Sequence, residues 1–252
     1  MKHHLSRLAL GAALLIALAG CAQAATPQPT AAPNPETPTP ALPSEVQNLH
    51  WFGTSSYLYH GSQDIYFDPV SLEGELPVAD LILVTHAHND HYSAGELLKI
   101  IGPDTILIIG PNATAVYEQT RDELGIPATV LAEGESSEVM GIKVEAVPAF
   151  EPRFHARGSG GVGFIVSVDG IRLYHAGGTN TYPEMAQYQC DVAMLPLYSL
   201  DDLKAMVAIV PAEVILVGHT SYYTVQALEK LINEDLNGEK MIVALEPRPF
   251  RP

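Results

Sequence analysis

The sequence has 252 residues and is poor in cysteine and in basic side chains, and both shortages narrow what the chain can be. Cysteine occurs only as Cys21 and Cys190. If Cys21 is modified, as argued below, no disulfide is possible, and Cys190 is expected to be a small buried apolar residue. The 13 Lys and Arg residues against 29 Asp and Glu residues give a net charge of −16. Such a field repels phosphate backbones and anionic lipid surfaces, so nucleic acid is not the expected partner.

Long apolar runs are scarce too, and the one near the N-terminus is too short to span a bilayer as a mature helix. Lys2 and Arg7 precede "LALGAALLIALAG", which is the charged head and apolar body of a secretory signal. The run ends in "LAGC", which resembles the bacterial lipobox, whose cysteine is lipidated and becomes the new N-terminus. We therefore expect export and lipid anchoring at Cys21, in the outer membrane or on the outer face of the cytoplasmic membrane. The alternative is an ordinary signal peptide cleaved after a site such as "AQA".

A proline-rich linker follows the apolar run. Residues 22–44 alternate proline with small polar residues, and proline prevents helix or sheet from propagating. Such a stretch is an extended spacer that would hold a domain off a membrane surface. The expected division is a lipoprotein signal peptide over 1–20, a lipid-anchored linker over 21–44 and one domain over 45–252. Removing 1–20 deletes two basic residues and no acid, so the charge moves from −16 to about −18.

Apolar and alternating runs predict strands first and then strands mixed with helices. The N-terminal part of the domain reads as a meander, followed by a buried strand over Leu81–Val84. Helices are predicted over 93–101 with Ser93 as N-cap, over 112–125 with Asn112 as N-cap and Gly125 at the end, and over 201–211 and 224–238. Sheets of this kind need both faces covered, so a layered α/β sandwich is the natural packing.

One short loop carries most of the metal-binding side chains. "THAHNDHY" follows the buried strand and contains His86, His88, Asp90 and His91. A loop at a strand end can direct such side chains toward one point. Imidazole and carboxylate together suit zinc, iron or manganese.

This loop resembles the H-x-H-x-D-H signature of the metallo-β-lactamase superfamily. Other similar pieces occur in the same order: "WFGTSSYLYHGSQDIYFDP" with a buried Asp68, "VPAFEPRFH", "GVGFIVSVDGIRLYHAGGTN" and "VILVGHT". The resemblance covers the whole domain and is nearest to the ascorbate-phosphate lactonase-like and N-acyl-phosphatidylethanolamine phospholipase-like hydrolases. It implies a four-layer αββα sandwich in a single domain.

The resemblance also implies a ligand set for two metal ions. Site one would be His86, His88 and His155, and site two would be Asp90, His91 and His219. The family usually adds one aspartate that bridges both metals, and that position reads Gly178 here. Two dications then lack a negative charge between them. We therefore expect one tightly bound zinc, with manganese or iron as alternatives, and a second metal that is weak or absent.

Several neighbouring residues have both a functional and an ordinary interpretation. Asp90 would orient the water or relay its proton. His175 is expected to make a hydrogen bond behind the ligands. Arg153 and Arg157 are either solvated loop charges or a clamp for an anionic substrate group. Tyr222 either lines the substrate pocket or packs against neighbouring side chains.

The sequence thus predicts a metal-dependent hydrolase tethered to a membrane by lipid. Its metal-activated water would attack a small-molecule ester, lactone, amide or phosphodiester. The alternative is a degenerate lipoprotein of the same fold that binds a metal or ligand without catalysis, and Gly178 is the feature that favours it. The fold by itself cannot choose between them.

Overall fold

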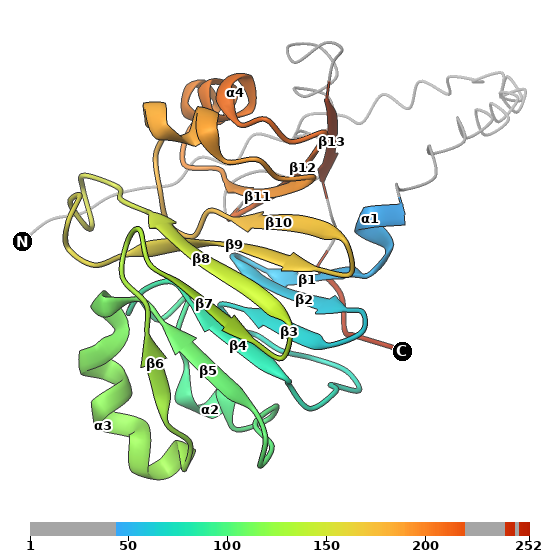
Figure 1. Ribbon diagram of the computed structural model, residues 1–252, viewed down its shortest axis with the longest axis vertical. Coiled ribbons are helices and arrows are strands. Elements are labelled where there is room, and N and C mark those ends of the chain that lie inside the picture. The colour runs from blue at the N-terminus through green and yellow to red at the C-terminus, as the bar shows by residue number, and fades with distance from the viewer. Residues whose placement is uncertain (1–43, 220–239, 245–246) are drawn as a thin grey trace, which may run out of the picture. The chain divides into compact units, whose positions relative to one another are not determined.

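The structure is a computed structural model that describes residues 44–219, 240–244 and 247–252 (Figure 1). Cys21, Tyr222 and the helix predicted over 224–238 lie outside the described residues. The described chain forms two β-sheets with a few helices outside them, which confirms the predicted α/β sandwich. None of the described helices is long and apolar enough to span a membrane.

The first sheet has six strands in sequential order. Its first three strands pair antiparallel and the remaining ones pair parallel. The strands are β1 (Leu49–Gly53), β2 (Ser56–His60), β3 (Asp64–Phe67), β4 (Leu81–Val84), β5 (Ile106–Ile109) and β6 (Ala128–Val130).

The second sheet has seven strands in the order β13-β12-β11-β10-β9-β8-β7. β7 to β10 pair antiparallel, and β10 to β13 pair parallel. The strands are β7 (Ser136–Val139), β8 (Ile142–Pro148), β9 (Val162–Val168), β10 (Ile171–His175), β11 (Val192–Pro196), β12 (Val214–Gly218) and β13 (Met241–Ala244).

Helices α2, α3 and α4 lie on the outer faces of the two sheets, so the layers alternate as αββα, whereas Val46 of the short α1 packs into the core between the sheets (Figure 1). Helices α2 and α3 cover the first sheet, whereas α4 covers the second. The helices are α1 (Ser44–Gln47), α2 (Ala94–Leu97), α3 (Thr114–Leu124) and α4 (Leu200–Ile209), with 3-10 turns η1 (Pro111–Ala113) and η2 (Pro183–Gln187).

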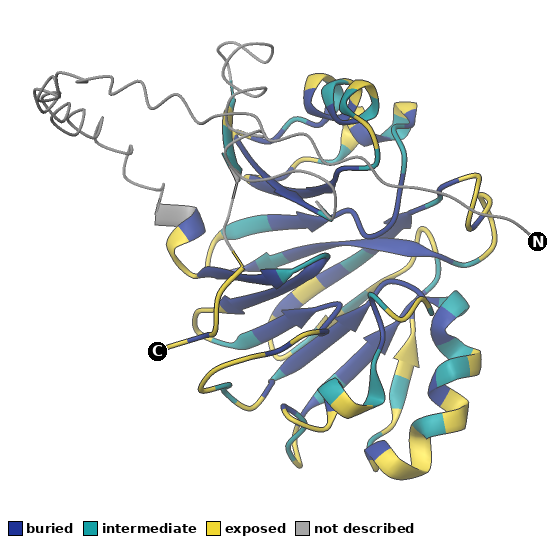
Figure 2. Ribbon diagram, turned by 180° about the vertical axis from the view of Figure 1, so that it is seen from behind, coloured by how far each residue is buried: buried dark blue, intermediate teal, exposed yellow. Residues whose placement is uncertain are grey.

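Both faces of the central strands are buried, which explains their continuous apolar runs (Figure 2). In β4, Leu81 and Leu83 face the core between the sheets, while Ile82 and Val84 face the core beneath α2 and α3. A third core lies between the second sheet and α4. Cys190 is buried in that third core and unpaired, as expected, and burial raises the pKa of its thiol to about 12.

Two helix ends test the capping predictions. Ser93 caps α2, accepting a hydrogen bond from the backbone of Glu96, as predicted. The prediction of Asn112 as an N-cap is wrong, because α3 begins at Thr114 after the η1 turn. The Asn112 side chain instead accepts from the backbone N–H of Ala87, near the histidine loop. The left-handed Gly125 ends α3 as predicted.

Candidate metal centre

The segments that leave the carboxyl ends of β4, β10 and β12 meet at one edge of the sandwich. The loop after β4 carries the first histidines, and His219 follows β12 directly. Asp90 from the first of these segments contacts His219 from the last. Polar side chains at the carboxyl ends of parallel strands commonly form ligand sites in α/β proteins.

Two groups of three side chains are brought together at this edge. His86, His88 and His155 form the first trio. Asp90, His91 and His219 form the second. Within each trio, one ligand atom per residue lies within 4.8 Å of the others. These are the six residues that the resemblance assigned to sites one and two.

The hydrogen bonds around Thr85 leave one nitrogen of His86 free to bind a metal. The single hydroxyl hydrogen of Thr85 goes to Oδ2 of Asp68 at 2.8 Å. Nδ1 of His86, 2.9 Å from the same hydroxyl oxygen, must then be the donor, so its Nε2 carries a lone pair. Burial, reinforced by the neighbouring His91, lowers the pKa of His86 well below its usual value. The ring is therefore held neutral, as a metal ligand must be.

The free nitrogen of His86 faces the next histidine of the loop. Its Nε2 lies 3.0 Å from Nδ1 of His88. Two nitrogens bound to one tetrahedral zinc at 2.0–2.1 Å lie about 3.3 Å apart. The observed separation therefore fits a shared cation with little adjustment.

Asp68 lies behind the ligands and orients them. Its carboxylate accepts from the backbone N–H of Thr85 at 2.7 Å, Nδ1 of His91 at 2.7 Å and Nε2 of His175 at 2.8 Å. Burial alone would raise the pKa of Asp68, but the charges and hydrogen bonds of His91 and His175 outweigh it and hold the pKa far below its usual range. Because Nδ1 of His91 donates to this carboxylate, the neutral ring presents the lone pair of Nε2, which lies 3.4 Å from the Ser55 hydroxyl, to the second trio.

The second trio is held by strained backbone. Oδ2 of Asp90 lies 3.2 Å from Nε2 of His219 and 3.9 Å from Nε2 of His91. The hydrogen bond from His219 is the main reason why the pKa of Asp90 is depressed. His219 has a φ of +56°, and its backbone N–H donates to Thr54, which also has a positive φ. Non-glycine residues in this conformation are costly and concentrate at functional sites.

A buried carboxylate shapes the loop that brings His155 to the first trio. Glu151 accepts hydrogen bonds from the backbone N–H groups of Arg153 and Phe154. The loop closes through an isolated bridge between Glu151 and His155. Burial, with smaller contributions from His88 and other histidines, lowers the pKa of His155.

Gly178 is buried against the first trio. A Cβ atom at this position would lie 2.9 Å from Cε1 of His86, 3.0 Å from the hydroxyl of Tyr198 and 3.1 Å from Nε2 of His155. Its φ lies outside the left-handed region, unlike that of the preceding Gly177. The backbone at position 178 therefore suits any residue, but a side chain there would point into the centre and the ring of His86 would have to shift to admit its Cβ.

The remaining candidates have other partners. His175 donates to Asp68, as expected for a residue behind the ligands. The guanidinium of Arg153 pairs with Glu151, and that of Arg157 pairs with Glu184 at 2.8 Å. A role for either arginine in substrate binding remains a prediction.

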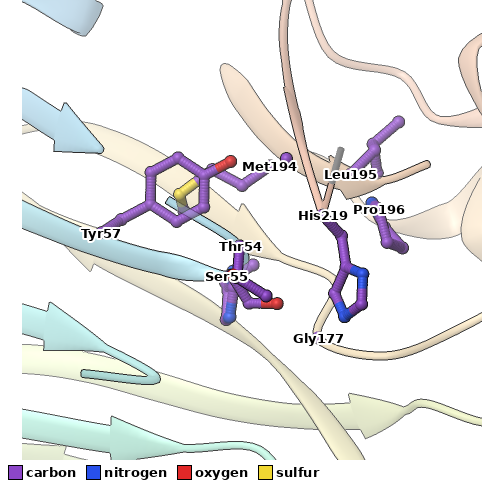
Figure 3. A pocket seen from close by; sticks show the side chains of 10 residues that line it. Thr54, Ser55, Tyr57, Gly177, Met194, Leu195, Pro196 and His219 are labelled. Atoms are coloured by element: carbon purple, nitrogen blue, oxygen red, sulfur yellow. The ribbon is translucent and has the colours of Figure 1, made fainter. Parts of the chain in front are cut away.

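A small pocket lies beside the second trio. Figure 3 shows the imidazole of His219 on one side of Ser55 and Thr54 and the ring of Tyr57 on the other. The apolar part of the lining comes from the end of β11, including Met194 and Leu195. The lining beside the second trio is therefore a mixed surface of hydroxyls and apolar side chains.

Comparison with known proteins identifies the family. The family model described as the Beta-lactamase superfamily domain matches residues 48–219, which is more than half of the chain. The chain belongs to the metallo-β-lactamase superfamily, among its metal-dependent hydrolases. A UPF0173 metal-dependent hydrolase of Methanoculleus marisnigri is 33% identical over 177 residues, covering 64% of this chain and 74% of that protein. One from Pyrococcus abyssi is 29% identical over 221 residues, covering 79% and 96%.

Two solved structures of metal-dependent hydrolases share the fold. A candidate metal-dependent hydrolase from Parabacteroides distasonis superposes with a TM-score of 0.66 at 24% identity, covering 78% of this chain and 91% of its own. Igni18, a metallo hydrolase from Ignicoccus hospitalis, gives a TM-score of 0.62 at 20% identity, covering 79% and 94%. At these identities the likeness concerns the fold alone.

Two residues of the site were not predicted from the sequence. Glu151 is a charged residue in a loop, and only its burial reveals its role. Tyr198 follows β11 at the same edge as the ligands, and its ring packs against His219 with centroids 5.0 Å apart. Its position directly after a parallel strand is the signal that could have drawn attention to it.

Proposed function

We propose that this metallo-β-lactamase-fold protein hydrolyses a small-molecule ester, lactone, amide or phosphodiester at a metal centre built on the two trios. The observation that carries the proposal is the convergence of six ligand side chains at one sheet edge. The free nitrogens of His86 and His91, fixed by hydrogen bonds on their opposite sides, support it further. The name of the sequence relatives, metal-dependent hydrolase, agrees with this chemistry.

Zinc is the proposed metal at His86, His88 and His155, a ligand set that leaves one position open. When bound, such a metal lowers the pKa of a coordinated water toward ~7 and polarises the oxygen of the scissile bond. The contribution of the chain is to hold these ligands neutral and oriented. Asp68 fixes the histidine tautomers from behind, and the half-exposed Asp90 is placed to accept a proton at the solvent side.

We also propose that the domain is exported and tethered by lipid on Cys21. The support is the lipobox-like "LAGC" after the apolar run and the proline-rich spacer over 22–44. The acidic net charge agrees with a domain that is attached to the membrane through its N-terminal anchor only.

A non-catalytic role in metal or ligand binding is the second candidate. Gly178 favours it, because this position faces the first trio and supplies no carboxylate. Six of the seven expected ligands are nevertheless present, which favours the hydrolase.

Turnover of ester, lactone, amide and phosphodiester panels separates the two candidates. The protein is assayed after removal of metal by a chelator and after addition of zinc or manganese. The hydrolase predicts activity that disappears with the chelator, returns with the metal and is absent from His86→Ala. Metal binding without metal-dependent turnover of any panel member would favour the second candidate.

A further inference from the structure

Gly178 and Tyr198 follow two neighbouring parallel strands and meet at the metal centre. β10 ends three residues before Gly178, and β11 ends two residues before Tyr198. The two strands pair side by side, so both residues leave the same sheet edge. Gly178 contributes no side chain to the metal centre, whereas Tyr198, from the neighbouring strand end, does.

The hydroxyl of Tyr198 stands in the region that an aspartate at position 178 would enter. It lies 3.0 Å from the place of a Cβ atom on Gly178. Standard bond lengths put the carboxylate oxygens of an aspartate about 2.4 Å from its own Cβ. The phenol oxygen thus lies at a distance from that Cβ position similar to the distance at which the missing carboxylate oxygens would lie.

Tyr198 also lies between the two trios. Its ring packs against His219 of the second trio at an interplanar angle of 60°. Its hydroxyl is within about 6 Å of Nε2 of His155 in the first trio, since both atoms lie close to the same Cβ position. A bridging carboxylate would have to stand between these same two groups.

The hydroxyl is not used elsewhere in the described part of the chain. Tyr198 is partly buried, and within residues 44–219, 240–244 and 247–252 its hydroxyl makes no hydrogen bond. The hydroxyl is therefore available to a cation bound beside the trios.

We propose that Tyr198 supplies the oxygen donor of the metal centre in place of the bridging aspartate. This rests on the proposed metal centre and extends it to a residue outside the six ligands. Burial, together with the nearby Asp90 and Glu151, holds the pKa of the Tyr198 phenol above its ordinary value, so it is neutral at pH 7, whereas an aspartate, with an ordinary pKa near 3.9, is charged. The substitution therefore retains an oxygen ligand but supports the second metal less strongly than a carboxylate would.

Metal titration of Tyr198→Phe tests this. Zinc binding to the purified full chain is measured by competition with a chromogenic chelator, which resolves the first and second equivalents. Removing the hydroxyl should leave the first equivalent nearly unchanged and weaken the second by at least about 10-fold. Tyr188→Phe is the matched control, because Tyr188 packs against Tyr174 and Tyr182 in the outer core, away from the trios.

A spectroscopic arm identifies the ligand directly. Tyrosine bound to iron(III) absorbs visible light by charge transfer, and phenylalanine cannot. The iron(III)-loaded protein should show this band in the wild type and in Tyr188→Phe, and lose it in Tyr198→Phe. Unchanged second-site affinity together with an unchanged spectrum in Tyr198→Phe would overturn the proposal.

The double variant Gly178→Asp/Tyr198→Phe tests the shared position. In Gly178→Asp alone the new Cβ meets Cε1 of His86 and Nε2 of His155 as well as the Tyr198 hydroxyl, and the second substitution removes only the contact with the hydroxyl. The double variant should bind the second zinc more tightly than either single variant. Equal affinity in Gly178→Asp and the double variant would contradict a shared position; if the aspartate variants do not fold, the Tyr198→Phe titration decides. Zinc binding by the wild type is read in the same experiment, so absence of the metal centre itself is distinguishable from failure of the Tyr198 assignment.

Discussion

Nε2 of His175 donates a hydrogen bond of 2.8 Å to Oδ2 of Asp68, and the same oxygen accepts from His91. His175 is therefore occupied behind the ligands, although its sequence motif lies close to Gly178. His155, from a loop between β8 and β9, faces the other side of the centre and joins His86 and His88. His155 and His175 both belong to segments that resemble the family's motifs, but the fold gives them different roles.

His155→Ala should remove most of the bound metal, whereas His175→Ala should weaken binding less. The first variant loses a direct ligand, and the second loses one of several donors to Asp68. Elemental analysis of both variants after identical dialysis measures the difference. Greater metal loss from His175→Ala would reverse the assignment.

Asp68→Asn should reduce metal affinity by about 10–100-fold, because it disturbs the partner that fixes the ligand tautomers. An amide nitrogen facing His91 and His175 cannot accept their hydrogen bonds. The affinity is measured by chelator competition. Asp169→Asn is a suitable control, since Asp169 accepts hydrogen bonds from Tyr59 and Ser62 far along the sheet from the trios. Equal affinities for both variants would contradict an orienting role for Asp68.

The stability of the metal-free protein should fall as the pH drops below about 6.5. The pKa of His86 is lower in the folded state than in the unfolded chain. As the pH falls, the unfolded chain therefore takes up a proton before the folded protein does, and the free energy of unfolding decreases. Each pH unit below 6.5 costs up to about 1.4 kcal/mol per such histidine until the folded-state pKa is reached. Urea unfolding in the presence of a chelator at pH 7.5 and 5.5 measures this. His86→Asn should show a shallower decline, and an identical slope in both proteins would refute the buried neutral histidine.

Cys21→Ser should release the protein from membranes or block its processing. A single acyl chain binds membranes only marginally, whereas several chains anchor stably, so loss of the modified cysteine removes the anchor. Fractionation and intact mass measurement report the result. A variant that stays in the membrane fraction at the normal mature mass would show that the anchor lies elsewhere.

Local patterns predicted the fold well. The apolar run predicted strand β4 because both faces of that strand are buried. Ser93 was predicted as an N-cap because capping depends on a residue only three positions away. Asn112 looked like an equally good cap. Its side chain is instead taken by the backbone of Ala87, a partner 25 residues away that no local pattern reveals.

The candidate site was predicted only in part, for a similar reason. The spacing of the histidines and the aspartate between His86 and His91 by itself predicts a metal site. The contact between Tyr198 and the space beside Gly178 depends on the pairing of β10 with β11 and has no counterpart in sequence spacing. Likewise, Glu151 shapes the loop that carries His155 only because the fold buries its carboxylate against the backbone of that loop.

The number of metal ions held per chain tests the account most directly. The purified wild-type protein is dialysed extensively, and its zinc, manganese and iron are measured by elemental analysis against protein concentration. Three histidines in the first trio and no carboxylate at Gly178 predict one retained metal per chain, with the second lost or only partly retained. Two metals per chain surviving dialysis would contradict the weak second site, and a metal-free protein that cannot be reloaded would contradict the metal centre itself.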